Sequence, residues 1–190
     1  KLNAIPLEEV ELGRNYAMVI STNGGLWRYL LGDTIRFTQK YPFKFVITGR
    51  TKHFINAFGE EVIVDNAEKA FNIACEQTHA SILEYTGGPI YMQGNQKGAH
   101  EWVIEFDKHP DDLNQFILAF DQALKSINSD YEAKRHKNLS LEMPHFVVAK
   151  HGLFYEWMKR RGKTGGQNKI PRLSNDREYL DQLIELNKSM

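Results

Sequence analysis

A lysine between glycines and a proline is the first feature of this sequence that could do chemistry. Lys169 lies in the stretch GGQNKIPR, where the glycines make the loop deformable and Pro171 makes it stiff. A lysine in such a loop can bring a compact positive charge to an anion. A solvated basic loop without a ligand is the alternative.

The nearby residues Gly162, Lys163 and Thr164 match the end of the triphosphate-binding pattern G-x-x-x-x-G-K-[ST]. That pattern requires a first glycine where this chain has Trp157, and it requires a buried strand before the loop. The stretch HGLFYEWMKRR instead has the apolar spacing of a helix, with basic residues at its C-terminal end. We therefore interpret Gly162 as a helix stop and reject a preformed phosphate loop.

Two further motifs could contact a nucleotide. The stretch YLLGD ends in Asp33, whose carboxylate can accept two hydrogen bonds from the vicinal hydroxyls of a ribose. A turn aspartate that accepts backbone amides is the alternative. Arg50 follows a glycine in the stretch GRTK, where its guanidinium could reach a ribose or phosphate, or lie solvated at a hinge.

Short strands and tight turns fill the first quarter of the chain and must hold Asp33. We interpret as strands the stretches YAMVIST, LWRYLL, TIRFT and FKFVIT, which are separated by turn residues such as NGG and YP. This pattern predicts an antiparallel sheet or a small barrel. From about Gly49 the pattern changes, and a further extended run, TKHFINAF, leads into the rest of the chain.

Strands and amphipathic helices are predicted in the rest of the chain. We expect helices over NAEKAFNIACEQ, over residues 111 to 128, over HGLFYEWMKRR and over NDREYLDQLIELNK. Asp65, with Glu68 three residues later, is typical of a capped start for the first of these helices. Further strands are expected at ASILEYT, HEWVIEF and HFVVAK, with the glycine-rich stretch TGGPIYMQGNQKG as a loop between the first two.

A sheet with helices packed on it, after an all-strand segment, predicts an α+β fold. We place a domain boundary near Gly49 and Arg50, so that residues 1–48 and residues 49–190 form separate units. In HEWVIEF, His100 and Glu101 face opposite sides of the predicted strand, which leaves only the pair Glu101 and Glu105 on one side. We therefore predict no metal site there.

Composition restricts the classes of partner. The chain has 190 residues, of which 42% are hydrophobic and 25% charged, and no stretch is long and apolar enough to predict a membrane span. Residues 131–190 carry twelve basic and seven acidic groups, which is too sparse for the basic face of a nucleic-acid binder. The single cysteine, Cys75, suits a reducing compartment, so we expect a cytoplasmic protein with neither nucleic acid nor membrane as partner.

The order of WRYLLGD, FKFVITGR and GGQNKIPR resembles the C-terminal part of the adenylate-forming enzymes, which carry Y-x-x-G-D, then G-R-x-[DK] at a hinge, then a terminal lysine motif. Within that superfamily the chain resembles the auxin-responsive acyl-acid amido synthetases, the Gretchen Hagen family, whose tail carries Q-[YF]-K-x-P-R. The resemblance runs from about Tyr16 to Leu186, and its last motif is the most specific.

The resemblance implies a ligase that uses ATP, with Mg²⁺ as the companion ion of ATP held mainly outside this chain. A carboxylate would attack the α-phosphate, pyrophosphate would leave, and an amine such as an amino acid would then attack the mixed anhydride to form an amide. Residues 1–48 would end the large adenylation domain, and residues 49–190 would form its C-terminal lid. The implied partners are the remaining N-terminal adenylation domain, a carboxylic acid and an amine.

The resemblance also implies a role for each matching residue. Asp33 would hold the ribose hydroxyls of ATP or of the acyl-adenylate, and Lys169 would be the catalytic residue that approaches the phosphate and carboxylate when the lid closes. The remaining implied residues bind the nucleotide or form the hinge: Tyr29, Arg50, Gln167 and Arg172 at the nucleotide, and Arg50 with Lys52 at the hinge.

Some features depart from the family pattern. Glu60 and Glu61 follow Gly59 where the family usually places a basic residue, and Asn168 replaces the usual aromatic residue. We find neither a Ser/Thr/Gly-rich phosphate loop nor an acyl pocket, so we expect this chain to be a fragment that is inactive alone. Two alternatives stay open, the lid of a thioester-forming enzyme and a non-catalytic α+β module that binds an anionic partner through its basic tail.

Overall fold

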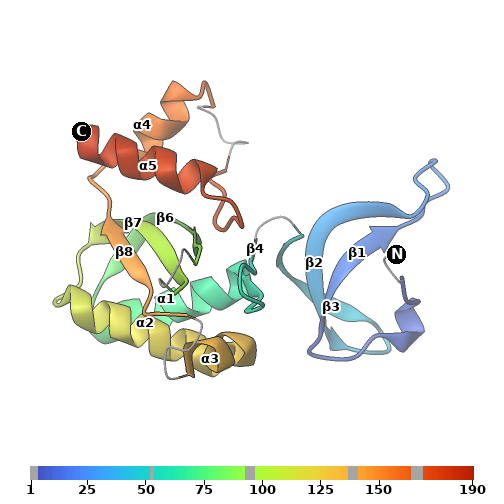
Figure 1. The fold of residues 1–190 in the computed structure, drawn as a ribbon. Coiled ribbons are helices and arrows are strands. Elements are labelled where there is room, and N and C mark those ends of the chain that lie inside the picture. Colours follow the sequence, from blue (N-terminus) through green and yellow to red (C-terminus); the bar gives the residue numbers. More distant parts are fainter. Residues whose placement is uncertain (1–3, 52–53, 93–96, 137–140, 164–168) are drawn as a thin grey trace.

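The computed structural model describes residues 4–51, 54–92, 97–136, 141–163 and 169–190, and its fold is drawn in Figure 1. The first sheet contains three antiparallel strands in the order β1-β2-β3. These strands are β1 (Asn15–Ile20), β2 (Tyr29–Gln39) and β3 (Lys44–Arg50), preceded by the short 3-10 helix η1 (Leu7–Glu9).

Strand β2 is one continuous element of 11 residues. The prediction of separate strands at LWRYLL and TIRFT was therefore wrong, because Gly32 continues the strand through a left-handed conformation (φ 91°) instead of ending it. A small core of Val10, Ile35 and Phe37 lies against this sheet. Many other apolar side chains of β2 and β3 are exposed, among them Leu30 and Ile47.

The larger part of the chain is built on a second sheet with the strand order β6-β7-β8. A two-stranded hairpin, β4 with β5, connects the first sheet to the first helix of this part (Figure 1). The elements in chain order are β4 (Phe54–Ile55), β5 (Val62–Ile63), α1 (Val64–Thr78), β6 (Ser81–Ile90), β7 (Ala99–Lys108), α2 (Leu113–Ile127), α3 (Ser129–Arg135), β8 (His145–Val148), α4 (Leu153–Arg160) and α5 (Glu178–Ser189).

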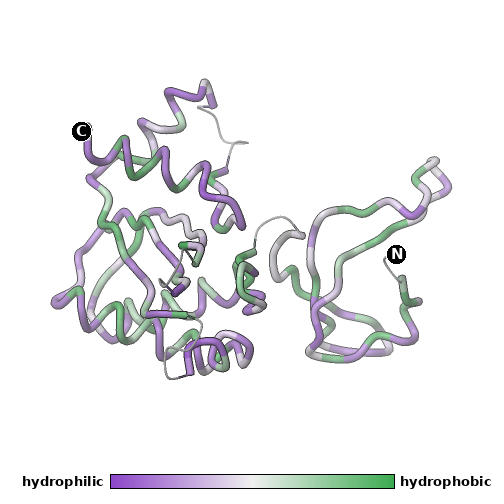
Figure 2. The backbone as a smooth tube through the Cα atoms, in the orientation of Figure 1, coloured by the Kyte–Doolittle hydropathy of each residue, from purple (hydrophilic) through white to green (hydrophobic). Residues whose placement is uncertain are grey.

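Helices cover both faces of the second sheet because side chains alternate along β7. Trp102 and Ile104 point into the core formed with α1 and α2, where Phe71 and Phe120 lie. Val103 points to the opposite face and packs with α4 and α5. Figure 2 shows hydrophobic stretches alternating with hydrophilic ones along these elements, as expected for helices and strands with one buried face.

The α+β prediction is confirmed, and strands β6 and β7 run antiparallel whereas β8 pairs with β7 in parallel. Two local predictions were wrong. Helix α1 begins before Asp65, and the side chain of Asn66, not Glu68, accepts the backbone N–H of Ile63 at the helix start (3.2 Å). The residues TGGPI, predicted as a loop, belong to β6.

Candidate functional site

The structure brings Asp33 and Arg50 together as paired residues on neighbouring strands. Asp33 on β2 lies opposite Arg50 on β3, at the end of the sheet from which the chain continues toward the hairpin. The backbone N–H of Thr51 donates to the carbonyl of Gly32 (2.8 Å), which holds this exit against β2. Two residues that the motifs predicted at a common ribose therefore share one end of a sheet.

Irregular pairing surrounds Asp33. Between Ala17 and Val19 of β1 the partner on β2 shifts from Thr34 to Leu30, so three residues of β2, from Leu31 to Asp33, lie opposite a single residue of β1. A bulge of this kind bends the strand and redirects a side chain, and such bulges are frequent beside active sites. The half-buried Asp33 thus lies at a point where the sheet departs from regular alternation.

The other residues predicted at the site come from two places. Tyr29 lies at the exposed beginning of β2, on the same strand as Asp33. Lys169 is exposed and belongs to the segment between α4 and α5, so it comes from the larger part of the chain. The predicted nucleotide contact Gln167 and the predicted hinge residue Lys52 lie outside the described residues.

Arg172 makes contacts within the protein. Its guanidinium forms an ion pair with Glu84 of β6 and lies over the ring of Tyr85, with 4.5 Å from Cζ to the ring centroid. Burial lowers the pKa of the Arg172 guanidinium below its ordinary value. A nucleotide contact by Arg172 stays a prediction, and it would require these contacts to be exchanged for contacts with the nucleotide.

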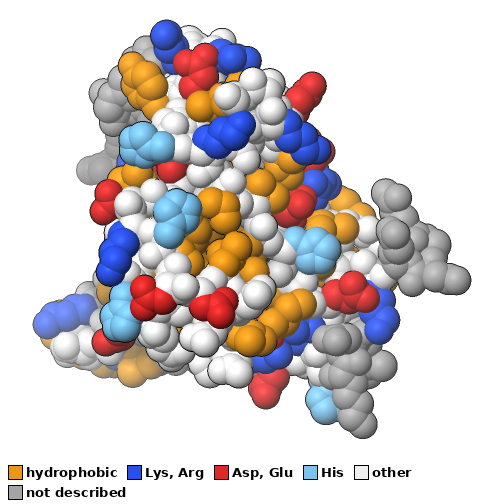
Figure 3. Space-filling model, turned by 90° about the vertical axis from the view of Figure 1, so that its left-hand side faces the viewer, with side chains coloured by type: hydrophobic (Ala, Val, Ile, Leu, Met, Phe, Trp, Pro, Cys, Tyr) orange, Lys and Arg blue, Asp and Glu red, His pale blue; other side chains and the backbone are white. Residues whose placement is uncertain are grey.

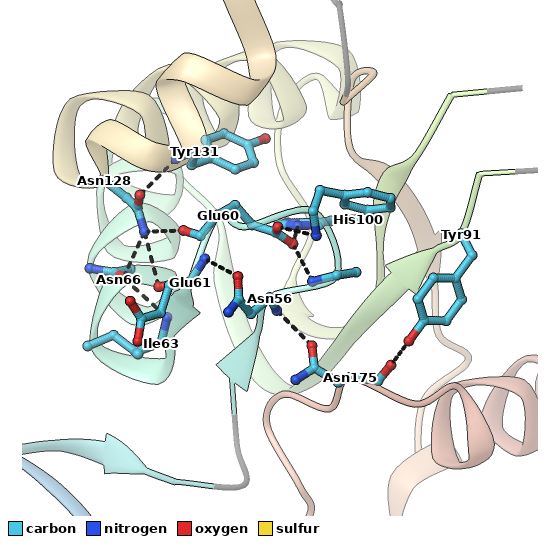
Figure 4. Close-up of polar contacts among 12 residues, drawn as sticks. Asn56, Glu60, Glu61, Ile63, Asn66, Tyr91, His100, Asn128, Tyr131 and Asn175 are labelled. Carbon is cyan, nitrogen blue, oxygen red and sulfur yellow. Dashed lines mark hydrogen bonds and ion pairs between the residues drawn. The ribbon is translucent and has the colours of Figure 1, made fainter. Parts of the chain in front are cut away.

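The structure explains why glutamate follows Gly59. Glu60 is fully buried and accepts the backbone N–H groups of Ala57 (3.2 Å) and Phe58 (2.7 Å), while His100 Nε2 lies 2.9 Å from its Oε1 (Figure 4). Burial alone would raise the pKa of Glu60, but its hydrogen bond to His100, the charge of His100 and the amide hydrogen bonds lower it. Glu60 therefore holds the turn of the β4–β5 hairpin to β7.

Asn128, at the junction of α2 and α3, holds the other side of that hairpin (Figure 4). Its Nδ2 donates to the carbonyls of Glu60 (3.0 Å) and Glu61 (3.3 Å), and its Oδ1 accepts the N–H of Tyr131 (2.8 Å). Glu61 is exposed with a left-handed backbone (φ 41°). The sequence carried no signal for the contacts of Asn128 with Glu60 and Glu61, because these two partners are more than sixty positions away.

The acidic residues of HEWVIEF have separate partners. Glu101 pairs with Arg177 (2.6 Å), whereas Glu105 accepts the N–H of Gly152 (2.6 Å) at the start of α4. Within the described ranges, no group of three or more His, Cys, Asp or Glu side chains is arranged to hold a metal ion. These carboxylates thus join the sheet to the segments around α4 and α5.

Stability is expected to fall in acid because two buried carboxylates have lowered pKa values. Glu60 is one, and Asp121 is the other, since burial would raise the pKa of Asp121 but hydrogen bonds from Arg135, Lys125 and Tyr131 lower it. Carboxylates with lowered pKa values stabilise the fold above their unfolded pKa of about 4, and this contribution is lost as pH falls through the folded values. The free energy of unfolding in urea should therefore decrease steadily below about pH 5.

The variant Glu60→Gln is the control for this pH dependence. It removes one of the two titrating groups, so its unfolding free energy should change less between pH 7 and pH 3 than that of the unmodified chain. An equal change in both proteins would show that Glu60 does not contribute.

Two family models match this chain, one in each of its two parts. A family model described as the GH3 family C-terminal domain matches residues 65–178, which is more than half of the chain. A second model, described as the GH3 family central domain, matches residues 1–50. The chain belongs to the GH3 family. The resemblance read from the three motifs is therefore confirmed.

Curated relatives are plant members of the GH3 family. Indole-3-acetic acid-amido synthetase GH3.8 of Oryza sativa subsp. indica is 29% identical over 189 residues, covering 88% of this chain and 30% of the relative. Indole-3-acetic acid-amido synthetase GH3.3 of Arabidopsis thaliana is 27% identical over 188 residues, covering 90% of this chain and 31% of the relative. The chain thus spans about a third of the length of the curated relatives it matches.

Solved structures share the fold. The GH3.15 acyl acid amido synthetase superposes with a TM-score of 0.73 at 21% identity, covering 97% of this chain and 34% of that one. A 2-hydroxyisobutyryl-CoA ligase in a postadenylation state gives a TM-score of 0.51 at 15% identity, covering 95% of this chain and 36% of that one. At these identities the likeness shows a common fold. Among the described helices, none is long and apolar enough to cross a membrane.

Proposed function

We propose that this chain is the C-terminal part of an ATP-dependent acyl-acid amido synthetase. Its membership of the GH3 family is the observation that carries the proposal, since the curated relatives GH3.8 and GH3.3 are named amido synthetases. The motif order and the pairing of Asp33 with Arg50 support it. In this reading residues 1–48 end the large adenylation domain, residues 49–190 form the lid, and the hinge lies near Arg50 and Lys52.

The proposed first reaction joins a carboxylic acid to AMP. A carboxylate oxygen attacks the α-phosphorus of ATP and pyrophosphate leaves, with Mg²⁺ as the ion that accompanies the ATP phosphates. The half-buried carboxylate of Asp33 accepts hydrogen bonds from the ribose hydroxyls, beside Arg50 and with Tyr29 on the same strand. The ammonium of Lys169 stabilises the charge that shifts to the phosphate oxygens, an effect that is strong where water is excluded.

The proposed second reaction forms the amide. The nitrogen of an amine attacks the acyl carbon of the mixed anhydride, AMP leaves, and the nitrogen releases a proton. The partners of this chain are accordingly the N-terminal adenylation domain of the same polypeptide, a carboxylic acid and an amine such as an amino acid.

The face of the molecule in Figure 3 bears on the alternative of an anion-binding module. Acidic and basic side chains are interspersed over this face, so it does not present a single-sign surface for an anionic partner. We also propose a cytoplasmic location, supported by the single cysteine of the sequence. The half-buried Cys75 has a raised thiol pKa because of burial, which suits an unreactive reduced thiol.

A screen with the full-length protein tests the proposed function. Pyrophosphate release from ATP should require a carboxylic acid, and adding a mixture of amino acids should yield an amide and AMP. The 190-residue chain alone should release no pyrophosphate and bind ATP weakly at most. A thioester product with coenzyme A in place of the amide would favour the thioester-forming alternative, whereas no dependence on any carboxylate would contradict adenylation.

A further inference from the structure

The segment that follows Lys169 docks on the free edge of the second sheet. Strand β6 is an edge strand, and the backbone N–H of Gly87 donates to the carbonyl of Arg172 (2.9 Å). The N–H of Ser174 in turn donates to the carbonyl of Gly87 (3.1 Å), and Leu173 pairs with Gly87 in a parallel bridge. These bonds attach a short extended segment to the edge of the sheet, and this segment begins three residues after Lys169.

Side chains strengthen this docking on both sides of the bridge. Thr86 Oγ1 donates to the carbonyl of Pro171 (2.7 Å), and Arg172 contacts Glu84 and the ring of Tyr85. The side chain of Leu173 is fully buried in the core. The backbone, one ion pair and one apolar side chain therefore hold the same short segment.

The docked segment also reaches the hairpin beyond the hinge. The Oδ1 of Asn175 accepts the backbone N–H of Asn56 (2.7 Å), and its carbonyl accepts the hydroxyl of Tyr91 (Figure 4). Arg177 continues the contacts, since it donates to the carbonyl of Pro89 (2.9 Å) and pairs with Glu101 (2.6 Å). Residues 171–177 thus lie along β6 from Glu84 to Pro89 and reach Tyr91 just beyond its end.

The two glycines of β6 leave room for different neighbours. A Cβ on Gly87 would lie 2.5 Å from ring carbons of the fully buried Trp102 of β7. A Cβ on Gly88 would lie 3.4 Å from the carbonyls of Ser174 and Asp176, so a larger side chain there would enter the space of the docked segment. Gly87 thus allows β7 to pack against β6, and Gly88 allows the docked segment to approach β6 closely.

The chain is also held before the lysine. The guanidinium of Arg161, at the end of α4, lies over the rings of Trp157 and Tyr179, with Cζ 4.6 Å and 4.7 Å from their centroids. The N–H of Lys163 donates to the carbonyl of Met158 (3.0 Å). The chain is therefore fixed at the end of α4 as well as from Pro171 onward.

We propose that Arg172, with Glu84 and Thr86, positions Lys169 for adenylation by holding the docked segment to β6. The inference rests on the proposed function, because the proposed function gives Lys169 its role in adenylation. If the backbone next to Lys169 is already ordered, the reacting complex does not have to lose the entropy of ordering it. A displacement of a catalytic group by about 1 Å can lower the rate about a hundredfold. In this proposal Arg172 acts through Lys169, which replaces the direct nucleotide contact that the family resemblance implies for Arg172.

The kinetic test uses the full-length protein and the variants Arg172→Gln, Glu84→Gln and the two combined. Each single variant should lower kcat for carboxylate-dependent pyrophosphate exchange about ten- to a hundredfold, with KM for ATP little changed. The double variant should lose little more than either single one, because both remove the same ion pair. Arg160→Gln is the matched control, since Arg160 is exposed and pairs with Glu156 within α4.

A second measurement does not depend on activity. Hydrogen exchange at the amides of Gly87 and Ser174 should become about tenfold faster or more in Arg172→Gln, while exchange at the core strand β7 stays unchanged and shows that the domain is folded. This measurement still decides the docking if the protein does not adenylate any acid. Unchanged exchange at both amides would overturn the proposal.

The outcomes separate this inference from the proposed function. No carboxylate-dependent exchange in the unmodified protein contradicts the proposed function alone. An active protein in which Lys169→Ala is impaired but Arg172→Gln and Glu84→Gln keep the normal kcat overturns the positioning role. A raised KM for ATP in Arg172→Gln, together with a normal Glu84→Gln, would instead make Arg172 a nucleotide ligand and also overturns it.

Discussion

Replacing Lys169 by alanine is expected to lower carboxylate-dependent pyrophosphate exchange in the full-length protein by roughly a hundredfold or more. The ammonium of Lys169 is exposed, and the residues that follow Lys169 are docked on β6. The lysine can therefore approach a nucleotide from an ordered backbone segment. Removing one preorganised group that stabilises transition-state charge costs about this much in other enzymes. The measurement is the exchange of labelled pyrophosphate into ATP with the acid that the screen identifies.

Lys163→Ala is the matched control for that experiment. Lys163 is also exposed and lies nearby in the sequence, but its backbone N–H donates to the carbonyl of Met158 and so closes the turn that ends α4. It should keep exchange within a few-fold of the unmodified protein. Near-normal exchange in Lys169→Ala, or an equal loss in Lys163→Ala, would contradict the role given to Lys169.

Replacing Asp121 by alanine is expected to destabilise the part of the chain built on the second sheet by about 3–5 kcal/mol. Asp121 on α2 is buried and accepts hydrogen bonds from Arg135 Nε (2.7 Å) and from the hydroxyl of Tyr131 (2.8 Å). Arg135 is itself only 5% exposed, so the substitution leaves a buried guanidinium without its carboxylate. Urea unfolding followed by tryptophan fluorescence measures the loss.

Glu132→Ala is the control for this stability experiment. Glu132 is an exposed acidic residue on α3, close in sequence to Tyr131 and Arg135. Its replacement should change the unfolding free energy by no more than about 0.5 kcal/mol. A cost below about 1 kcal/mol for Asp121→Ala would show that the ion pair contributes little to the stability of the α2–α3 junction.

Local signals predicted most of the regular structure of the second part. The apolar spacing of residues 111–128 predicted a helix whose face includes Phe116, Phe120 and Leu124, and these three side chains are buried. Such periodicity is a property of the sequence itself. The helix α3 was not predicted, because its seven residues are too few to show a period.

The glycine pair shows where local signals misled. Gly87 and Gly88 predicted a loop because glycines are common in turns. In the structure they lie in β6, where a side chain on Gly87 would meet Trp102. Only the packing of β7 against β6 reveals this constraint, since Trp102 is fifteen positions later in the sequence.

The candidate site also combines residues that the sequence predicted with contacts that only the structure reveals. Motif order predicted that Asp33 and Arg50 belong together, and strand pairing places them opposite each other. Their contacts with ATP, and those of Tyr29 and Lys169, stay predictions. The glutamates after Gly59 departed from the family pattern, and the structure shows that Glu60 is a buried partner of His100, forty residues away.

The sequence by itself determined the α+β class, the family and the motifs that carry the proposed chemistry. This was possible because periodicity and motif spacing depend only on the order of residues along the chain. Only the tertiary structure decided which side chains meet. The pairs Glu60 with His100, Arg172 with Glu84, and Asp121 with Arg135 join residues 14 to 88 positions apart. Such contacts depend on strand register and helix packing, which no local pattern specifies.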